Sequence, residues 1–137
     1  MWKNDDISHF MKYEDILSVL DECNDSCIFI WNITDDHYSI SRKAVDKFNL
    51  DNHSFNHVLK TLENVVYPDD APMLDEDVKR LIHDKAGLHN LEYRWYNKNH
   101  QPVWIRCKGQ VVNDNENNSL FLIGSISELG TRSKYDN

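Results

Sequence analysis

Alternation of apolar and polar residues in the C-terminal third is the feature that most constrains the fold of this chain. In residues 91–96 and again in residues 103–111, every second residue is apolar. A period of two is typical of a strand with one buried face. The polar residues 97–101 between these segments predict a turn, so the pattern indicates two long antiparallel strands. Residues 120–126 are apolar at both alternating sets of positions and predict a last strand that is covered on both faces.

The segment VVYPDDAPML, residues 65–74, predicts the start of a helix. Two valines and a tyrosine close an apolar segment, and Asp69 or Asp70 then offers a carboxylate to cap the free N–H groups of a new helix. Pro72 fits the first turn because that turn does not use the missing N–H. Apolar residues follow at a spacing of three to four, which predicts a helix over 70–85 with one buried stripe.

The other expected elements complete an α+β domain. They are a helix over 7–20, a strand over 27–31, a returning strand over 38–41, a short helix carrying 44–48 and a helix over 53–62. Short helices are not stable alone, and an open meander leaves an apolar face in water, so we expect the helices to lie across the sheet. The predicted architecture is a five-stranded antiparallel sheet with helices packed on one face, plus an N-terminal amphipathic helix. That helix or a second copy of the protein is expected to cover the other face.

Length and charge limit the organisation and the partners. A chain of 137 residues suits one domain, divided here into an N-terminal helix and linker (1–24), a core domain (25–130) and a tail (131–137) that leads toward an effector domain. The net charge of −8 repels phosphate backbones and anionic lipid headgroups, so neither nucleic acid nor direct membrane contact is expected. No apolar run is long enough to cross a bilayer or to form a signal peptide, and we expect a cytoplasmic location.

Candidate metal ligands and nucleophiles do not assemble into a reactive centre. Cys23, Cys27 and Cys107 lack the paired spacings of a zinc site, and we expect reduced thiols. His53 and His57 are spaced as a chelating pair on one helix, but no third ligand is near in the sequence, so exposed positions are expected. Cys107 falls inside a predicted strand without a neighbouring histidine that would activate it. The domain itself is therefore predicted not to be an enzyme.

Several short motifs follow one another in an order known from one family. They are Phe29-Ile30-Trp31-Asn32, Ile40-Ser41, Phe48-Asn49-Leu50, Tyr67-Pro68-Asp69-Asp70, and Glu92-Tyr93-Arg94 with Trp104 and Gly124. Over about residues 27–129 the chain resembles PAS (Per-Arnt-Sim) domains, in particular the bacterial subgroup found in sensor histidine kinases and GGDEF diguanylate cyclases. The resemblance implies a PAS-type sensory and dimerisation module that regulates such an effector. The strand faces that need covering from outside, together with the amphipathic N-terminal helix, predict a homodimer that forms through that helix and the outer face of the sheet.

The resemblance leaves the ligand open, because PAS domains bind haem, flavin, small metabolites or nothing. The alternative function is a haem or flavin sensor, or a small enzyme on the same fold. Haem would require an axial ligand such as His83, whose place near a helix end also suits contact with the terminal carbonyls, so an empty or small-molecule pocket is favoured. The candidates for lining a pocket between sheet and helices, or alternatively for ordinary core packing, are Phe29, Trp31, Tyr38, Leu81, Tyr93, Ile105, Cys107, Phe121 and Ile123.

Overall fold

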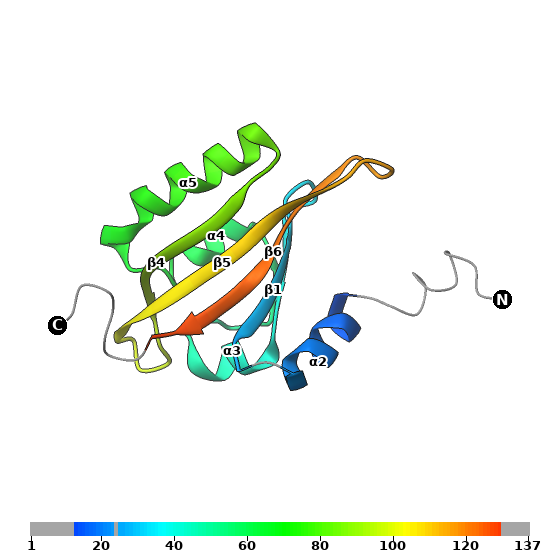
Figure 1. Ribbon diagram of the computed structural model, residues 1–137. Coiled ribbons are helices and arrows are strands. Elements are labelled where there is room, and N and C mark those ends of the chain that lie inside the picture. The colour runs from blue at the N-terminus through cyan, green and yellow to red at the C-terminus, as the bar shows by residue number, and fades with distance from the viewer. Residues whose placement is uncertain (1–12, 24, 130–137) are drawn as a thin grey trace.

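A computed structural model describes residues 13–23 and 25–129 of the chain (Figure 1). Its strands form one antiparallel sheet in the order β3-β2-β1-β6-β5-β4. They are β1 (Cys27–Asn32), β2 (His37–Ile40), β3 (Ser54–Asn56), β4 (Leu88–Tyr96), β5 (Pro102–Asp114) and β6 (Ser119–Glu128). The predicted α+β class is confirmed, and the first strand joins the same sheet as the C-terminal meander, with Asn32 paired to Phe121.

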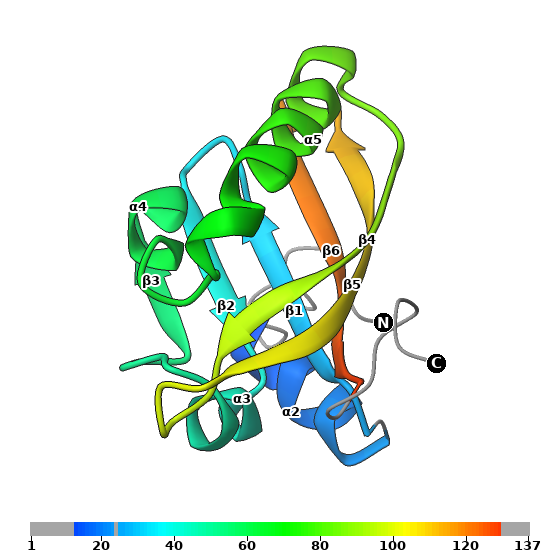
Figure 2. The ribbon, with the colours of Figure 1, turned by 90° about the vertical axis from the view of Figure 1, so that its left-hand side faces the viewer.

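The helices lie on both sides of this sheet. They are α2 (Tyr13–Cys23), α3 (Arg42–Lys47), α4 (Val58–Leu62) and α5 (Ala71–Asp84), and a short 3₁₀ turn, η1 (Pro68–Asp70), leads into α5. Figure 2 shows α4 and α5 in front of the sheet and α2 behind it. The helix predicted from the Pro-Asp-Asp segment is confirmed, and Leu74, Val78 and Leu81 form its buried stripe.

The main core fills the space between the sheet and helices α3 to α5. Antiparallel partners share a face, so Cys107 with Ile126 and Val111 with Leu122 all point into this core. Aromatic side chains fill its centre: Phe48 packs edge-on against Trp95 with ring centroids 5.1 Å apart. Each large apolar side chain that is fully buried contributes about 1.5–3 kcal/mol to stability, so this layer is what holds the short helices on the sheet.

The helix predicted over 53–62 is wrong in its first half. Residues 54–56 form β3, a sixth strand that pairs with β2, and α4 begins only at Val58, after His57 in a left-handed conformation with φ of 52°. Pairing places Phe55 opposite Tyr38, where the two rings stack with centroids 5.0 Å apart. This cross-strand contact draws Phe55 into the sheet, although its spacing from Val58 also suits a helix.

The N-terminal helix is confirmed for the part that the structure describes. Helix α2 runs to Cys23, three residues beyond the predicted end at Leu20. The predicted apolar positions Ile7, Phe10 and Met11 lie outside the described residues, as does the tail 131–137.

Strands β5 and β6 approach each other closely at the paired Gly109 and Gly124. A Cβ on Gly124 would overlap the Lys108 carbonyl oxygen and lie 2.6 Å from the Gly109 Cα. We therefore expect Gly124→Ala to lower the free energy of unfolding by more than about 3 kcal/mol, because backbone atoms cannot yield as a side chain does. Urea denaturation followed by circular dichroism measures this loss.

Gly109→Ala is the matched control for this pair. Its Cβ would meet the Leu122 side chain at 3.1 Å and the Ile123 carbonyl oxygen at 3.2 Å, contacts that small shifts relieve. We expect its loss of stability to be clearly smaller. Equal losses for the two variants would contradict the packing argument.

Candidate functional site

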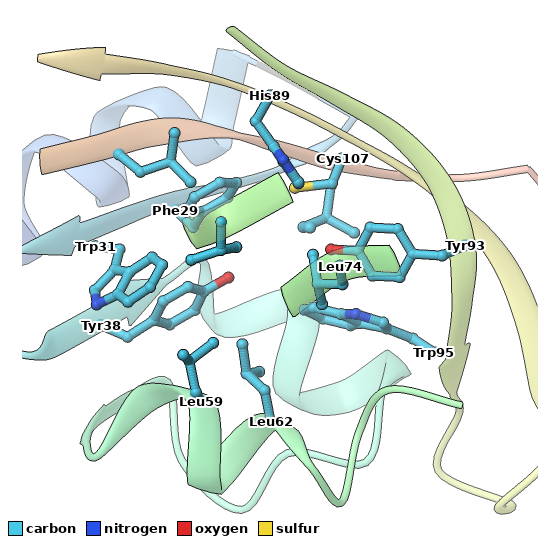
Figure 3. Close-up of a pocket in the computed structure, with 13 residues that line it drawn as sticks. Phe29, Trp31, Tyr38, Leu59, Leu62, Leu74, His89, Tyr93, Trp95 and Cys107 are labelled. Atoms are coloured by element: carbon cyan, nitrogen blue, oxygen red, sulfur yellow. The ribbon is translucent and has the colours of Figure 1, made fainter. Parts of the chain in front are cut away.

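A small cavity lies inside the core, between the sheet and helices α4 and α5 (Figure 3). Its volume is about 30 Å³, close to the space that one water molecule occupies in the liquid. The strands supply aromatic walls and the helices supply leucines and a valine. The lining residues are Phe29, Trp31, Tyr38, Leu59, Leu62, Leu74, Val78, His89, Tyr93, Trp95, Cys107, Leu122 and Ile126.

The polar groups that face the cavity are mostly neutral, and the tyrosine hydroxyl groups among them both donate and accept hydrogen bonds. The hydroxyl groups of Tyr38 and Tyr93 point toward its middle from opposite sides (Figure 3). Burial raises the pKa of both tyrosines well above the usual value, and burial raises the pKa of Cys107 to about 12. These three groups therefore keep their protons at physiological pH.

Two buried indole N–H groups have no hydrogen-bond partner among the described residues. They belong to Trp31 and Trp95, whose side chains are 5% and 1% exposed and which both line the cavity. A buried donor that lacks an acceptor costs about 1–3 kcal/mol. The Trp95 indole lies beside Tyr93, whose hydroxyl oxygen is able to accept a hydrogen bond as well as donate one.

His89 is a cavity residue that the sequence analysis missed. From β4 it points into the core, 2% exposed, and its Nδ1 lies 2.6 Å from Asp77 Oδ2 on α5. Burial alone would raise the pKa of Asp77, but hydrogen bonds from Arg80 and His89 together with their charges lower it. The pair joins the middle of α5 to the edge strand of the sheet. The sequence signal that was overlooked is the alternation of His89 with Leu91 and Tyr93, which extends the core face of the strand by two residues.

The structure divides the sequence-predicted pocket candidates into three groups. Phe29, Trp31, Tyr38, Tyr93 and Cys107 line the cavity. Leu81 and Ile105 are buried in the same core but do not contact the cavity. Phe121 and Ile123 lie on the opposite face of the sheet, so their expected place between sheet and helices is wrong. Ligand binding by the first group stays a prediction.

The error on β6 has a physical cause. Both alternating sets of this strand are apolar, so its period does not identify the inner face. Pairing with β1 decides it: Leu122 is opposite Trp31 and faces the core, while Ile123 is opposite Ile30 and faces outward. One residue of register separates the two arrangements.

An apolar groove of about 560 Å³ runs along the outer face of the sheet, beside α2. Helix α2, strands β1 and β6, and the end of β5 form its walls. The lining residues are Ile16, Leu20, Ile28, Ile30, Val112, Asp114, Phe121 and Ile123. The outer groove, as we call these residues, leaves Ile123 37% exposed and Val112 42% exposed. Helix α2 therefore covers this face only in part, whereas the double-sided apolar pattern of β1 and β6 predicted that both faces are covered.

Helix α2 is fastened to the domain at its C-terminal end. The Asp21 carboxylate accepts a hydrogen bond from the Ser41 hydroxyl and forms an ion pair with Lys43, whose Nζ lies 3.0 Å away. Ser41 also stands at the N-cap position of α3, but its hydroxyl makes no capping hydrogen bond there. After the helix, Ser26 Oγ lies 2.7 Å from Ser127 Oγ on β6.

The Asp70 carboxylate binds Arg94 and makes no capping hydrogen bond at the start of α5, contrary to prediction. It accepts hydrogen bonds from Arg94 Nε (2.9 Å), Nη2 (2.8 Å) and the Arg94 backbone N–H (2.9 Å). The guanidinium lies between the rings of Tyr67 and Trp104, 4.1 Å and 4.9 Å from their centroids. Arg106 also pairs with Glu92 at 2.8 Å on this hairpin.

The histidines do not form the sites considered for them. The His83 side chain is 90% exposed on α5 and lies 3.1 Å from Asp84, so a haem bound to it would lie outside the core. His53 and His57 flank β3 and do not share one helix face. His57 is exposed as predicted, whereas His53 is half-buried. Within residues 13–23 and 25–129, no cluster of three potential metal ligands occurs. Nor does a helix in those residues have the length and apolar character needed to cross a membrane.

Comparisons with known proteins agree with this fold. A family model described as PAS fold matches residues 38–126, so the chain belongs to the PAS family, whose domains are generally non-catalytic sensor modules. A search of curated proteins finds no match.

Two solved structures share the fold. One is a sensory box histidine kinase/response regulator from Burkholderia thailandensis, 15% identical, with a TM-score of 0.62 over 82% of this chain and 83% of that one. The other is the N-terminal domain of a diguanylate cyclase with PAS/PAC sensor from Marinobacter aquaeolei, 17% identical, with a TM-score of 0.63 over 77% and 95%. At these identities the likeness concerns the fold alone.

We expect Asp70→Asn to lower the free energy of unfolding by about 2 kcal/mol at pH 7, because it removes charge-assisted hydrogen bonds. Burial alone would raise the pKa of Asp70, but the hydrogen bonds and charge of Arg94 lower it below the usual value of an aspartate. A depressed carboxyl pKa gives stability that is present at neutral pH and is lost as the pH falls from the usual aspartate pKa through the lowered one. Urea denaturation from pH 7 down to pH 3 should therefore show the variant and the wild type converging in acid.

The adjacent, exposed Asp69 offers a matched control. Asp69→Asn removes the same charge one residue away and should change stability by less than about 0.5 kcal/mol. A loss equal to that of Asp70→Asn would mean that net charge, and not the Arg94 contact, explains the effect.

Proposed function

We propose that the chain is the sensory and dimerisation domain of a bacterial signalling protein and that it controls a linked effector, such as a GGDEF diguanylate cyclase or a histidine kinase. Membership of the PAS family supports the sensory role. The two solved structures that share the fold come from proteins named as a histidine kinase and a diguanylate cyclase, which supports the class of effector. A cytoplasmic location stays a prediction.

The observation that carries the proposal is the junction between the two ends of the domain. Cys27 at the start of β1 pairs with Ile126 near the end of β6, and the hydroxyls of Ser26 and Ser127 are in contact. Leu129, the last described residue, donates its N–H to the Trp104 carbonyl oxygen on β5. A shift of β6 would therefore move the base of α2 and the start of the following segment together.

The outer groove supports the dimerisation part of the proposal. It is apolar, it lies beside α2, and it leaves large side chains in water. Exposed apolar patches of this kind mark interaction sites. A second copy would bring the same groove and the same helix, so the contact would be self-complementary about a two-fold axis. In this arrangement the contact between Ser26 and Ser127 in each copy would lie near the interface.

The alternative of a haem or flavin sensor is less well supported by the geometry. A cavity of about 30 Å³ is far smaller than either cofactor, and His83 points away from it. An absorption spectrum of the purified protein distinguishes the two, since bound haem or flavin would give visible bands.

We expect Ile123→Glu to weaken the dimer by at least about tenfold in dissociation constant, because a carboxylate in an apolar interface loses its hydration. Sedimentation velocity at micromolar to high micromolar concentration measures the change, and circular dichroism checks the fold. The control is Leu88→Glu, on a side chain that is 67% exposed and does not line the outer groove. It should dimerise as the wild type does. A wild type that stays monomeric at high micromolar concentration would contradict the dimerisation part.

A further inference from the structure

One side of helix α2 is left uncovered by its own domain. Ile16 lines the outer groove, and Val19 and Glu22 follow it at intervals of three residues. Each interval falls about 60° short of a full helical turn, so the three side chains form a strip that leads from the groove toward solvent. Val19 is 60% exposed, and Glu22 is exposed without an ion pair in the described part of the chain. An apolar and a charged side chain therefore stand side by side on the open side of α2.

The sheet carries an exposed positive charge, Lys108, on the far side of the outer groove. Its neighbour Cys107 points into the core, so Lys108 on β5 points to the outer face. Helix α2 lies over β1 and β2, whereas β5 lies beyond the groove from the helix. Within the described residues Lys108 has no ion pair. The outer groove thus has a helix along one side and an unpaired lysine on the other.

Glu22 and Lys108 lie at the same height along the strands. Antiparallel pairing places Ile28 of β1 and Lys108 of β5 in one row, on either side of the same β6 residue. The Ser41 N–H donates to the Ile28 carbonyl oxygen, and the Ser41 hydroxyl donates to the Asp21 carboxylate. The last turn of α2, which contains Glu22, is therefore level with the row that ends at Lys108.

We propose that the outer groove of each copy receives helix α2 of a second copy, parallel to its own α2, with Val19 packed in the groove and Glu22 of the second copy paired with Lys108. This inference rests on the dimerisation proposed above and specifies its arrangement. The two-fold axis runs parallel to the two helices and between them. Rotation about it turns the solvent side of each α2 toward the sheet of the other copy and keeps Glu22 at the height of Lys108.

The apolar side chains favour this axis over the other two-fold arrangements. An axis across the helices would stack α2 on α2 and leave the groove open, with Ile123 and Val112 still in water. An axis perpendicular to the sheet would place the copies side by side and would bring no helix into the groove. Only an axis along α2 buries Val19 and the groove together.

The charges favour the same arrangement. Each chain has a net charge of −8, so two copies repel each other at long range. A local pair of opposite charges offsets this repulsion and determines the relative orientation of the copies more than it adds to affinity. Glu22 with Lys108 supplies such a pair twice, because a two-fold axis repeats every contact.

A mixing experiment tests the charge pair. The homodimer of Lys108→Glu contains two contacts between acidic residues, and that of Glu22→Lys contains two between lysines. We expect either variant alone to dimerise with a roughly tenfold larger dissociation constant than the wild type. An equal mixture of the two variants restores both opposite-charge contacts, so the heterodimer should form about as tightly as the wild-type dimer. Sedimentation velocity with one variant fluorescently labelled measures the heterodimer.

Lys79→Glu is the matched control for the charge change. Lys79 is exposed on α5, on the opposite side of the sheet from α2 (Figure 2). This variant should dimerise as the wild type does. A mixture of the two charge variants that associates no more tightly than either variant alone would overturn the arrangement, and so would an equal weakening by Lys79→Glu. Circular dichroism of each variant checks that the fold is retained.

The apolar part of the contact has its own test. Val19→Ser removes a side chain that is exposed in the single copy and buried in the dimer, so we expect at least about a tenfold increase in the dissociation constant. Met73→Ser is the matched control, because Met73 is 44% exposed on α5 and does not line the outer groove. It should dimerise as the wild type does. A Val19→Ser protein that dimerises equally well would overturn the placement of α2 in the groove.

These results separate the arrangement of the dimer from dimerisation itself. A wild type that stays monomeric overturns both. A wild type that dimerises and is weakened by Ile123→Glu, but whose charge variants do not recover on mixing, overturns the arrangement alone and leaves the proposed function standing.

Discussion

Pairing between β1 and β6 is the interaction on which the rest of the structure depends. These strands come from opposite ends of the domain and form the centre of the sheet, with β2 and β3 on one side and β5 and β4 on the other. Their register determines that Leu122 faces the core and Ile123 faces the outer groove. A slip of one residue would exchange the two faces of β6. The side chains that β6 contributes to the core cavity and to the outer groove would then change places.

Sequence periodicity correctly predicted the strands and the helix that have a single apolar face. The long strands β4 and β5 and the stripe of α5 follow directly from periods of two and of three to four. The inner face of β6 did not follow, because both of its faces are apolar. Strand β3 was missed because three residues are too few to show a period, and the ring of Tyr38 on the neighbouring strand decides its conformation. The cavity itself depends on how side chains from distant elements fit together, which no local pattern records.

Polar side chains next to helix starts serve long-range contacts in this domain. Ser41 and Asp70 both stand where a cap is expected, yet Ser41 binds Asp21 of α2 and Asp70 binds Arg94 of β4. Local rules identify such residues as caps because the nearest backbone donors are always available. A charged partner outcompetes those donors, since charge-assisted hydrogen bonds are roughly twice as strong. As a result, Asp21 anchors α2 on the outer side of the sheet, and Asp70 anchors the start of α5 on the core side.

The placement of these anchors determines which parts of the domain are able to transmit a signal. Helix α5 is joined to β4 through Asp70 and Asp77, so that side of the core is rigid, whereas α4 has no comparable ion pair among its described residues. Strand β6 contacts the core cavity through Leu122 and Ile126 and the outer groove through Phe121 and Ile123. It is packed against β5 at Gly124 without space for a side chain, so the two strands move together. In the sensory role proposed above, a ligand that enlarged the cavity would act most directly on β6, and through it on the outer groove and on the contact between Ser26 and Ser127.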